Sequence, residues 1–513
     1  MNLRYNYSMN KKFYITTPIY YVNDVPHMGH TCTTVAADII ARYHKLLGKD
    51  VFFLTGTDEH GAHVAQEAEK AGLSPQEFTD KVSQTFQNIW PKLNIQYDYF
   101  IRTTNPQHKN VVQDLIQKIY DKGDIYKAKY EGLYCLGCEK FLTETDLVDG
   151  KCPLHPNLTP QQQSEDNYFF KLSKYVPTLI EAIEKDDSNN HYLVSPPGKK
   201  EEVLSKLKSG ITDLSISRAN VSWGIPIPWD TSQTIYVWFD ALLNYYTALK
   251  ITGKEKFWPA DLHLIGKEIL WFHAVIWEAM LLSAEIPLPK EVFAHSFYMI
   301  DGQKMSKSLG NVISPQDLLD KFGVDGARYL IASSFPRDND SDVGWQKFTE
   351  KYNADLANGL GNLVARVTTL AEKFSEGKVP PINDDPEKHP LMAIELNTWR
   401  KIDKCLKNAR LPEALENIWQ YLSEADRYID QNKPWELATK NRKKFNWVLY
   451  GLLNTLSQIA WQIYPFMPKT ACEIGQRLGI GEILVENPLY KDSWTNIKQG
   501  VPIKSGPPLF PRI

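Results

Sequence analysis

The segment 13–47 constrains the fold of this chain more than any other stretch. Its first residues predict a strand that ends at Pro18, and an apolar pattern with a 3.6-residue period predicts a helix from about Thr31. His27 and His30 stand where the helix begins, and their spacing places both side chains on one side of its first turn. The first turn of a helix carries unpaired N–H groups and the positive end of the dipole, so the segment predicts an anion site there.

Taken alone, the pair His27 and His30 is more often two surface histidines, or half of a metal site. A second feature, at 301–311, argues for a ligand. It holds two lysines, two serines and two glycines, the composition of a mobile cationic loop suited to a polyphosphate. Alone, this charge run would be solvated surface. Gly29, between the histidines, has no Cβ and would let a flat ligand lie against the backbone.

Residues 27–30 (His-Met-Gly-His) and 304–308 (Lys-Met-Ser-Lys-Ser), in this order, resemble the two signatures of class I aminoacyl-tRNA synthetases. The resemblance covers nearly all of the 513 residues and is closest to the methionyl-tRNA synthetases. It implies catalytic roles for His27, His30, Lys304 and Lys307. It also implies that ATP, bound with Mg²⁺, contacts both motifs and one strand-to-helix turn: His27, Gly29, His30, Gly266, Lys267, Glu268, Lys304, Ser306, Lys307 and Ser308.

The implied fold class is α/β, a Rossmann-like nucleotide-binding catalytic domain with a zinc-knuckle insertion, followed by an all-α anticodon-binding helical bundle. The expected ranges are 1–121 and 218–300 for the catalytic halves, 122–217 for the insertion, 301–345 for the lysine-loop and stem-contact segment, 346–495 for the helical domain and 496–513 for a tail folding back on the core. The apolar helical period over 346–478 supports the helical domain, with a break at 379–390.

The composition places the chain among globular proteins. It is 43% hydrophobic and 23% charged, with no uninterrupted apolar run long enough for a membrane span. The first twelve residues lack the apolar centre of a secretory signal, so we expect a cytoplasmic protein without a membrane partner. A net charge of −3 argues against a general coating of nucleic acid, so an RNA partner would have to meet local basic patches.

Asp58 follows a short apolar strand predicted at 50–56, at the carboxyl end of the sheet, where open α/β sheets bind ligands. It could hold a substrate ammonium group by a charge-assisted hydrogen bond, or cap the helix that follows, or do both. The resemblance implies that it binds the amine of the amino acid.

An aromatic set of residues follows in the second catalytic half. On a helix predicted over 270–282, His273 and Trp277 stand four apart on one face with the preceding Ile269. Such a stripe alone is more often core, but an aromatic enclosure with polar tips would favour a thioether side chain. The resemblance implies a methionine pocket, in which Leu242 replaces the proline of some members: Ile19, Tyr21, Asp58, Trp238, Ala241, Leu242, Tyr245, Ile269, His273 and Trp277.

Three clustered cysteines and one histidine have the spacing of a zinc knuckle: Cys135, Cys138, Cys152 and His155. Independent thiols are the alternative. With four ligands and no fifth candidate, the expected Zn²⁺ is structural, one per chain. The insertion of about a hundred residues leaves no room for the large hydrolytic editing domain of the isoleucine, valine and leucine relatives.

Asn362 and Arg366 stand four apart on one predicted helix, and Trp435 follows Pro434 at another helix start. Asparagine and arginine can read base edges, and an exposed tryptophan can stack on a base. Taken alone, Asn362 and Arg366 are more often structural, and Trp435 is as often structural as base-stacking. The resemblance implies that these three residues contact the anticodon.

The implied activity is that of a methionine–tRNA ligase, acting on ATP, L-methionine and initiator and elongator tRNA(Met). We expect a monomer, because the dimerising tRNA-binding domain of longer members is not found. Another class I synthetase, a small-molecule nucleotidyltransferase and a non-catalytic tRNA-binding relative are the alternatives. The short insertion and aromatic residues argue against the first, the lysine loop and helical region against the second, and the complete set of His27, His30, Lys304 and Lys307 against the third.

Overall fold

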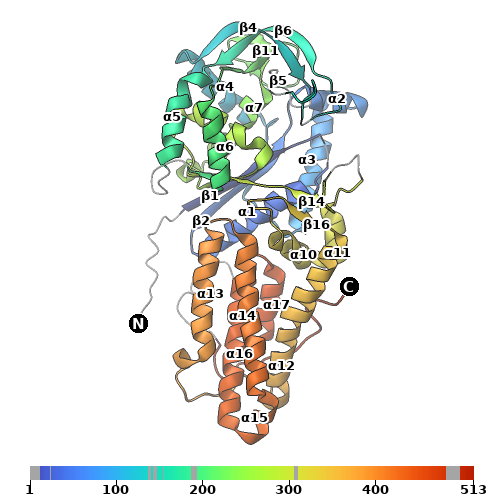
Figure 1. Cartoon of the computed structure of the whole chain (residues 1–513), viewed down its shortest axis with the longest axis vertical. Coiled ribbons are helices and arrows are strands. Elements are labelled where there is room, and N and C mark those ends of the chain that lie inside the picture. Colours follow the sequence, from blue (N-terminus) through green and yellow to red (C-terminus); the bar gives the residue numbers. More distant parts are fainter. Residues whose placement is uncertain are drawn as a thin grey trace.

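The computed structural model has an α/β half and a bundle of long helices at its opposite end (Figure 1). It describes residues 12–23, 25–136, 140–142, 147–153, 155–185, 193–305, 310–480 and 497–513.

The α/β half is organised on a parallel six-stranded sheet within the described residues. Neighbouring residues of its strands point to opposite faces, and both faces are buried, since Phe13 and Tyr14 belong to two different hydrophobic clusters. The order of the strands across the sheet is β3 (Tyr99–Arg102), β2 (Asp50–Asp58), β1 (Lys12–Tyr21), β12 (Leu262–Gly266), β13 (Glu291–His295) and β7 (Leu193–Ser195).

The prediction that the first strand ends at Pro18 is wrong. β1 runs on to Tyr21, and its pairing with β2 shifts register between Thr16 and Ile19. Proline cannot donate to a ladder, but a bulge removes the need for its N–H, so the strand passes through it. The extension brings Tyr21 opposite Asp58 at the carboxyl end of the sheet.

Helices cover both faces of the sheet. One face packs against α1 and α3, and the other against α4, α8 and α9. The helices around the central sheet, together with α2 and α7, have these bounds: α1 (Met28–Leu46), α2 (Ala62–Lys70), α3 (Pro75–Lys92), α4 (Pro106–Asp121), α7 (Val237–Ala241), α8 (Asn244–Thr252) and α9 (Glu278–Ala284).

The range 122–217 forms a second, mainly antiparallel sheet with two helices, although β7 from this range joins the central sheet. The sheet has the order β5 (Lys140–Leu142), β4 (Ile125–Cys135), β6 (Gln161–Phe170) and β8 (Leu214–Ser215), beside α5 (Leu172–Lys185) and α6 (Pro197–Lys208). A small sheet of β10 (Pro226–Ile227), β11 (Asp230–Ile235) and β9 (Ser217–Arg218) follows.

The lysine-loop region contains a three-stranded sheet and a kinked helix. The strands are β15 (Gln303–Lys304), β14 (Tyr298–Ile300) and β16 (Ser341–Val343), and the helix is α10 (Pro315–Ser333). Gly323 adopts a φ of 68° inside α10, a conformation that glycine reaches without strain, and the helix kinks there.

The remaining helices form the bundle, with α15 at its far end (Figure 1). They are α11 (Trp345–Lys351), a π-helical segment (Tyr352–Gly361), α12 (Asn362–Phe374), α13 (Pro390–Leu406), α14 (Leu411–Asn432), α15 (Pro434–Lys440), α16 (Arg442–Ile463) and α17 (Pro468–Arg477).

A buried ion pair network joins the two halves. Asp38 of α1 accepts from Arg42 at 2.8 Å and pairs with Arg328 of α10 at 2.6 Å. Arg328 also donates to the carbonyls of Pro465 and Phe466 at the end of the bundle, at 2.9 and 2.8 Å. The helix capped by His27, α1, is therefore joined to the bundle through fully buried charged side chains.

The described tail, residues 497–513, lies against the helical region. Val379 and Val501 are hydrogen-bonded through their backbones, Phe510 is buried against Tyr352, and Ile513 pairs with Asn353. Among the described residues, no helix is both long and apolar enough to cross a bilayer.

Candidate active site

His27 and His30 lie together at the start of α1, as their spacing predicts. The helix begins three residues earlier than predicted, so His27 is its N-cap. The two imidazole rings stack with their centroids 3.9 Å apart, and both are half-buried. His30 also packs against Tyr20 and Phe86, which fix its orientation.

Backbone amides determine which nitrogen of each ring is available. The Gly29 N–H donates to His27 Nδ1 at 3.1 Å, and the His27 N–H donates to His30 Nδ1 at 3.4 Å. Burial lowers the pKa of His27 to about 4, and burial together with the neighbouring His27 lowers the pKa of His30 well below its ordinary value. Both rings are thus neutral at pH 7 with the proton on Nε2, and each can donate it to a bound anion.

The lysine loop begins and ends beside these histidines. The Met28 N–H donates to Ile313 O at 3.0 Å, just after the loop. Before it, Met305 reaches Gly29, since its Cε lies 3.9 Å from where a Cβ on that glycine would stand. Lys304 closes β15 and pairs with Met299. Ser306, Lys307 and Ser308 lie outside the described residues.

Asp58 is buried at the end of β2, opposite Tyr21 of β1. Burial, followed by the charges of Tyr20 and Asp58, raises the pKa of Tyr245, so the carboxylate and the phenol are electrostatic neighbours. The alternative role as a helix cap is wrong, because α2 begins at Ala62 with Gly61 as its N-cap. The Asp58 carboxylate therefore lies near Tyr245, one of the predicted aromatic residues.

The predicted methionine-binding residues lie in one region. Ile19, Tyr21, Trp238 and Ile269 pack half-buried on the cluster that contains the buried Leu242, Tyr245 and Trp277, and Ala241 is buried beside Leu242. The Tyr245 ring lies 5.6 Å from that of His273 and 5.9 Å from that of Trp277. Trp238 stacks on Phe272 with centroids 4.0 Å apart.

The helix that carries His273 differs from the prediction. Lys267–Ile269 is a 3-10 turn and Phe272–Trp277 is π-helical, and α9 begins only at Glu278. His273 Nδ1 lies 2.9 Å from Ile269 O, so this nitrogen carries the proton and Nε2 accepts from the Tyr245 hydroxyl at 2.6 Å. Burial lowers the pKa of His273 to about 4, which keeps the ring neutral.

Two residues that hold Trp277 in place, His263 and Thr16, have no recognisable pattern in the sequence. Trp277 Nε1 donates to His263 Nε2 at 3.3 Å, and His263 Nδ1 lies 2.7 Å from Thr16 Oγ1. His263 and Thr16 are register partners on β12 and β1. Only the pairing of these strands, which lie far apart in sequence, makes them neighbours.

The turn after β12 carries the three further residues predicted to contact ATP. The Glu268 side chain folds back onto Gly266, and its carboxylate occupies the space that a Cβ at this position would need. Lys267 forms an ion pair with Asp340 at 2.6 Å and lies 4.5 Å above the Phe297 ring. The Lys267 ammonium is therefore held toward β14 and β16.

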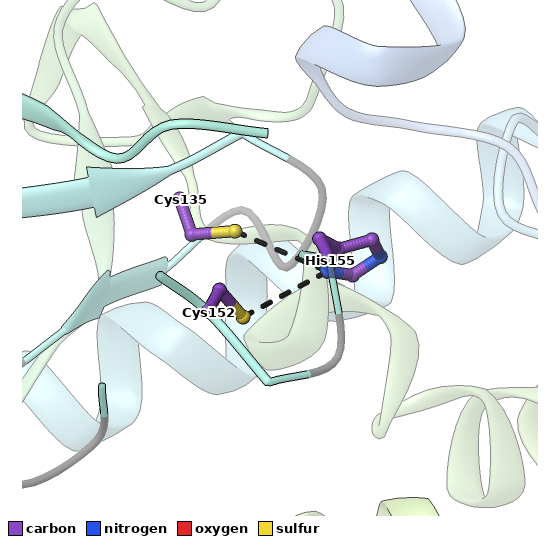
Figure 2. Close-up of side chains that lie close together, drawn as sticks. All are labelled: Cys135, Cys152 and His155. Carbon is purple, nitrogen blue, oxygen red and sulfur yellow. Dashed lines mark hydrogen bonds between the residues drawn. The ribbon is translucent and has the colours of Figure 1, made fainter. Parts of the chain in front are cut away.

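Cys135, Cys152 and His155 converge at one end of the second sheet (Figure 2). The two sulfurs lie 3.9 and 4.0 Å from His155 Nδ1. Ligands of a tetrahedral zinc ion are roughly 3.4–3.8 Å apart, so the three atoms are close to the required spacing. Cys138 lies outside the described residues.

The three predicted anticodon residues lie on the helical bundle. Asn362 and Arg366 occupy α12, and Arg366 is held by Asp426 and Asp430 of α14, each at 2.7 Å. Trp435 is the second residue of α15 and is 45% exposed.

Comparison with known proteins agrees with this arrangement. A family described as class I tRNA synthetases (M) matches residues 13–158 and 155–368. The methionine–tRNA ligase of Clostridium acetobutylicum is 43% identical over 99% of this chain and 79% of its own length. This chain belongs to the class I methionyl-tRNA synthetase family. The Synechocystis methionine–tRNA ligase is 42% identical over 91% of the chain and 89% of its own length.

Solved structures of the family have the same fold. The methionyl-tRNA synthetase of Mycobacterium tuberculosis in complex with methionyl-adenylate superposes with a TM-score of 0.92, at 35% identity, over 98% of this chain and 100% of that one. The α/β fold followed by a helical region is thereby confirmed.

Proposed function

We propose that this chain is a methionine–tRNA ligase that activates L-methionine with ATP and transfers the methionyl group to tRNA(Met). Family membership supports the reaction. The observation that carries the proposal is the meeting of three groups at the carboxyl end of the sheet. The two stacked imidazoles, the flanks of the lysine loop and the Asp58 carboxylate beside an aromatic cluster all lie there.

Methionine would bind between Asp58 and the aromatic residues. The buried carboxylate suits the α-ammonium group by a charge-assisted hydrogen bond. The thioether would lie among Tyr245, His273 and Trp277, since sulfur makes favourable contacts with aromatic edges. Because neutral His273 uses both nitrogens within the chain, it would present no charge to the apolar side chain of the substrate.

In the first step, the methionine carboxylate oxygen attacks the α-phosphorus of ATP and pyrophosphate leaves. ATP enters as its Mg²⁺ complex. His27 and His30 would donate their Nε2 protons to phosphate oxygens, and Lys304 and Lys307 would balance the charge that develops on the leaving pyrophosphate. No side chain needs to act as a nucleophile.

In the second step, a hydroxyl of the 3′-terminal ribose of tRNA attacks the methionyl carbonyl and AMP leaves. The enzyme contributes chiefly by holding the two reactants in line. At the other end of the molecule, Asn362, Arg366 and Trp435 would contact the anticodon. Two aspartates hold the Arg366 side chain in place. The exposed position of Trp435 on α15 leaves its ring accessible to a base.

We further propose a structural Zn²⁺ held by Cys135, Cys138, Cys152 and His155. Zinc bound there would close the end of the second sheet, where Cys135 and Cys152 are buried. Metal analysis should find one zinc per chain, lost in Cys152→Ser with unfolding of this sheet. A metal-free native protein would contradict the assignment. The monomeric state and the cytoplasmic location remain predictions. Analytical ultracentrifugation would measure the oligomeric state.

Charging of tRNA tests the whole proposal. The protein should attach methionine to a tRNA(Met) transcript with ATP present, and an otherwise identical transcript with an altered anticodon should be charged at least about tenfold more slowly. No charging of either transcript, or equal charging of both, would contradict it.

A further inference from the structure

Beside the methionine-binding residues lies a buried carboxylate that the proposed chemistry does not use. Asp240 belongs to α7, between Trp238 and Ala241, and is 1% exposed. Its Oδ2 lies 2.6 Å from His60 Nδ1, and its Oδ1 lies 2.8 Å from His108 Nε2. Both oxygens of one carboxylate are thus engaged by imidazoles from two other elements.

The direction of these hydrogen bonds follows from the charge on Asp240. Burial raises its pKa, but His60 and His108 outweigh burial and hold the pKa of Asp240 at about 2. An ionised carboxylate only accepts, so both imidazoles donate to it. His108 Nδ1 then lies 2.7 Å from the Thr247 hydroxyl, which extends the connection to α8.

Trp223 holds His60 and the residues on either side of it in place. The His60 ring meets that of Trp223 edge to face at 5.6 Å. Trp223 Nε1 donates to Glu59 O at 2.6 Å, and the Gly61 N–H donates to Trp223 O at 2.9 Å. The segment after Asp58 is therefore clamped on both sides of His60.

This connection joins three segments that supply part of the proposed methionine site, and it passes through His108 of α4, which supplies none. β2 ends at Asp58, two residues before His60, while α7 carries Trp238 and α8 carries Tyr245. Charged hydrogen bonds in a buried site keep a fixed geometry better than apolar contacts, which allow sliding. We infer that Asp240 is a positioning residue, which sets the distance between the carboxylate that binds the methionine ammonium and the aromatic wall that receives the thioether.

This inference rests on the proposed function, so its test begins with the wild-type protein. Without methionine-dependent ATP–pyrophosphate exchange in the wild type, the proposed function fails. With exchange, Asp240→Asn is decisive, because its amide can accept from only one of the two imidazole N–H groups. We expect the KM for methionine to rise about tenfold or more, the KM for ATP to stay within twofold, and kcat to change less than the KM for methionine.

Two further variants separate positioning from general stability. Thr247→Val keeps the shape of the side chain but removes the hydroxyl next to His108, so it should raise the KM for methionine about threefold. Asp124→Asn removes an equally buried carboxylate that binds Lys174 and Ser283 instead, and it should leave both KM values unchanged. A KM for methionine within twofold of wild type in Asp240→Asn, or an equal rise in both KM values, would overturn the inference. If that variant does not fold, an unchanged KM in Thr247→Val would overturn it.

Discussion

At His27 and His30, helix capping and anion binding use different atoms of the same rings. Nδ1 of each ring accepts a backbone N–H, so the proton is held on Nε2. The sequence predicted the pair and its position at the start of a helix. It could not predict the tautomers, which depend on the orientation of backbone amides.

The lysine loop can be tested at the level of one side chain. Lys307→Ala should lower the rate of methionyl-adenylate formation by about 10²–10³-fold, because a cation near the leaving pyrophosphate stabilises charge that exists mainly in the transition state. Methionine affinity should change little. Single-turnover kinetics measure the first quantity, and a near-normal rate would remove Lys307 from this role. Lys321→Ala, on α10, is the matched control and should behave as wild type.

Other residues of the site could not be found from the sequence. His263 supports Trp277, and Asp240 joins two histidines, yet none of these contacts has a periodic signature. Asp58 was predicted to follow a strand over 50–56, and it is the last residue of β2. Its alternative role as a helix cap is wrong because α2 begins only at Ala62, with Gly61 as its N-cap. The type and position of a residue in the sequence indicate what chemistry it can perform. Its contacts with residues distant in sequence can be found only from the folded structure.

At the scale of elements, the sequence predicted regular segments well and irregular ones poorly. α3 and α4 begin where the sequence carries start signals, because Ser74 and Asn105 cap them and a proline follows each cap. In contrast, β1 continues past Pro18 and the helix at Phe272–Trp277 is π-helical. Both segments make contacts with residues distant in sequence: β1 pairs with β2 and β12, and the Tyr245 hydroxyl donates to His273 in the π-helical segment.

A buried carboxylate in α13 gives the helical region a dependence on pH. Glu395 is 5% exposed, and its Oε2 has no hydrogen-bond partner among the described residues. Burial raises the pKa of Glu395 from 4.5 to about 7, against the smaller opposing effect of Trp399. Since the folded state binds this proton more tightly than the unfolded state, the stabilisation is present below pH 4.5 and is lost as the pH rises to about 7.

Glu395→Gln should therefore stabilise the protein at pH 8. The neutral amide avoids burying a charge, and we expect the free energy of unfolding to rise by about 2–3 kcal/mol at pH 8, with little change at pH 4.5. Denaturant unfolding at both pH values measures this difference. An equal effect at the two pH values, or destabilisation at pH 8, would contradict the assigned titration. Glu350→Gln, at an exposed position on α11, is the control.

At the scale of the whole molecule, the central sheet lies between the second sheet, at one end, and the helical bundle, whose α15 forms the other end (Figure 1). The proposed chemistry, at the central sheet, is therefore well separated from Trp435 on α15. The helical period predicted the bundle, but the way it joins the α/β half could not be read from the sequence. That junction depends on Arg328, Asp38 and carbonyls near residue 466, which are brought together only by folding.

Arg328→Met tests this junction. It would leave Asp38 with a single cationic partner, Arg42, and would also remove the donors to Pro465 and Phe466. Breaking such a buried pair should lower the free energy of unfolding by about 3–5 kcal/mol. Thermal and denaturant unfolding measure the loss, with exposed Arg427→Met on α14 as control. A loss below about 1 kcal/mol would mean that the junction is held by apolar packing alone.

Trp435→Ala should impair the charging of tRNA without impairing the activation of methionine. Loss of a stacked base should weaken tRNA(Met) charging by about 5–150-fold, while methionine-dependent pyrophosphate exchange stays normal. Exposed Leu396→Ala on α13 is the control for truncating a surface apolar side chain in the same region. Equal loss of charging and exchange would make Trp435 a structural residue of the bundle.

Amino-acid-dependent ATP–pyrophosphate exchange, with each of the twenty amino acids tested separately, examines the central claim most directly. The assay needs neither tRNA nor the helical region's proposed contacts, so it reports on the imidazoles, the lysine loop, Asp58 and the aromatic wall alone. Exchange with methionine and with no other amino acid is the predicted result. Exchange with a different amino acid would contradict the assignment of the aromatic residues, and no exchange with any amino acid by the folded protein would contradict catalysis itself.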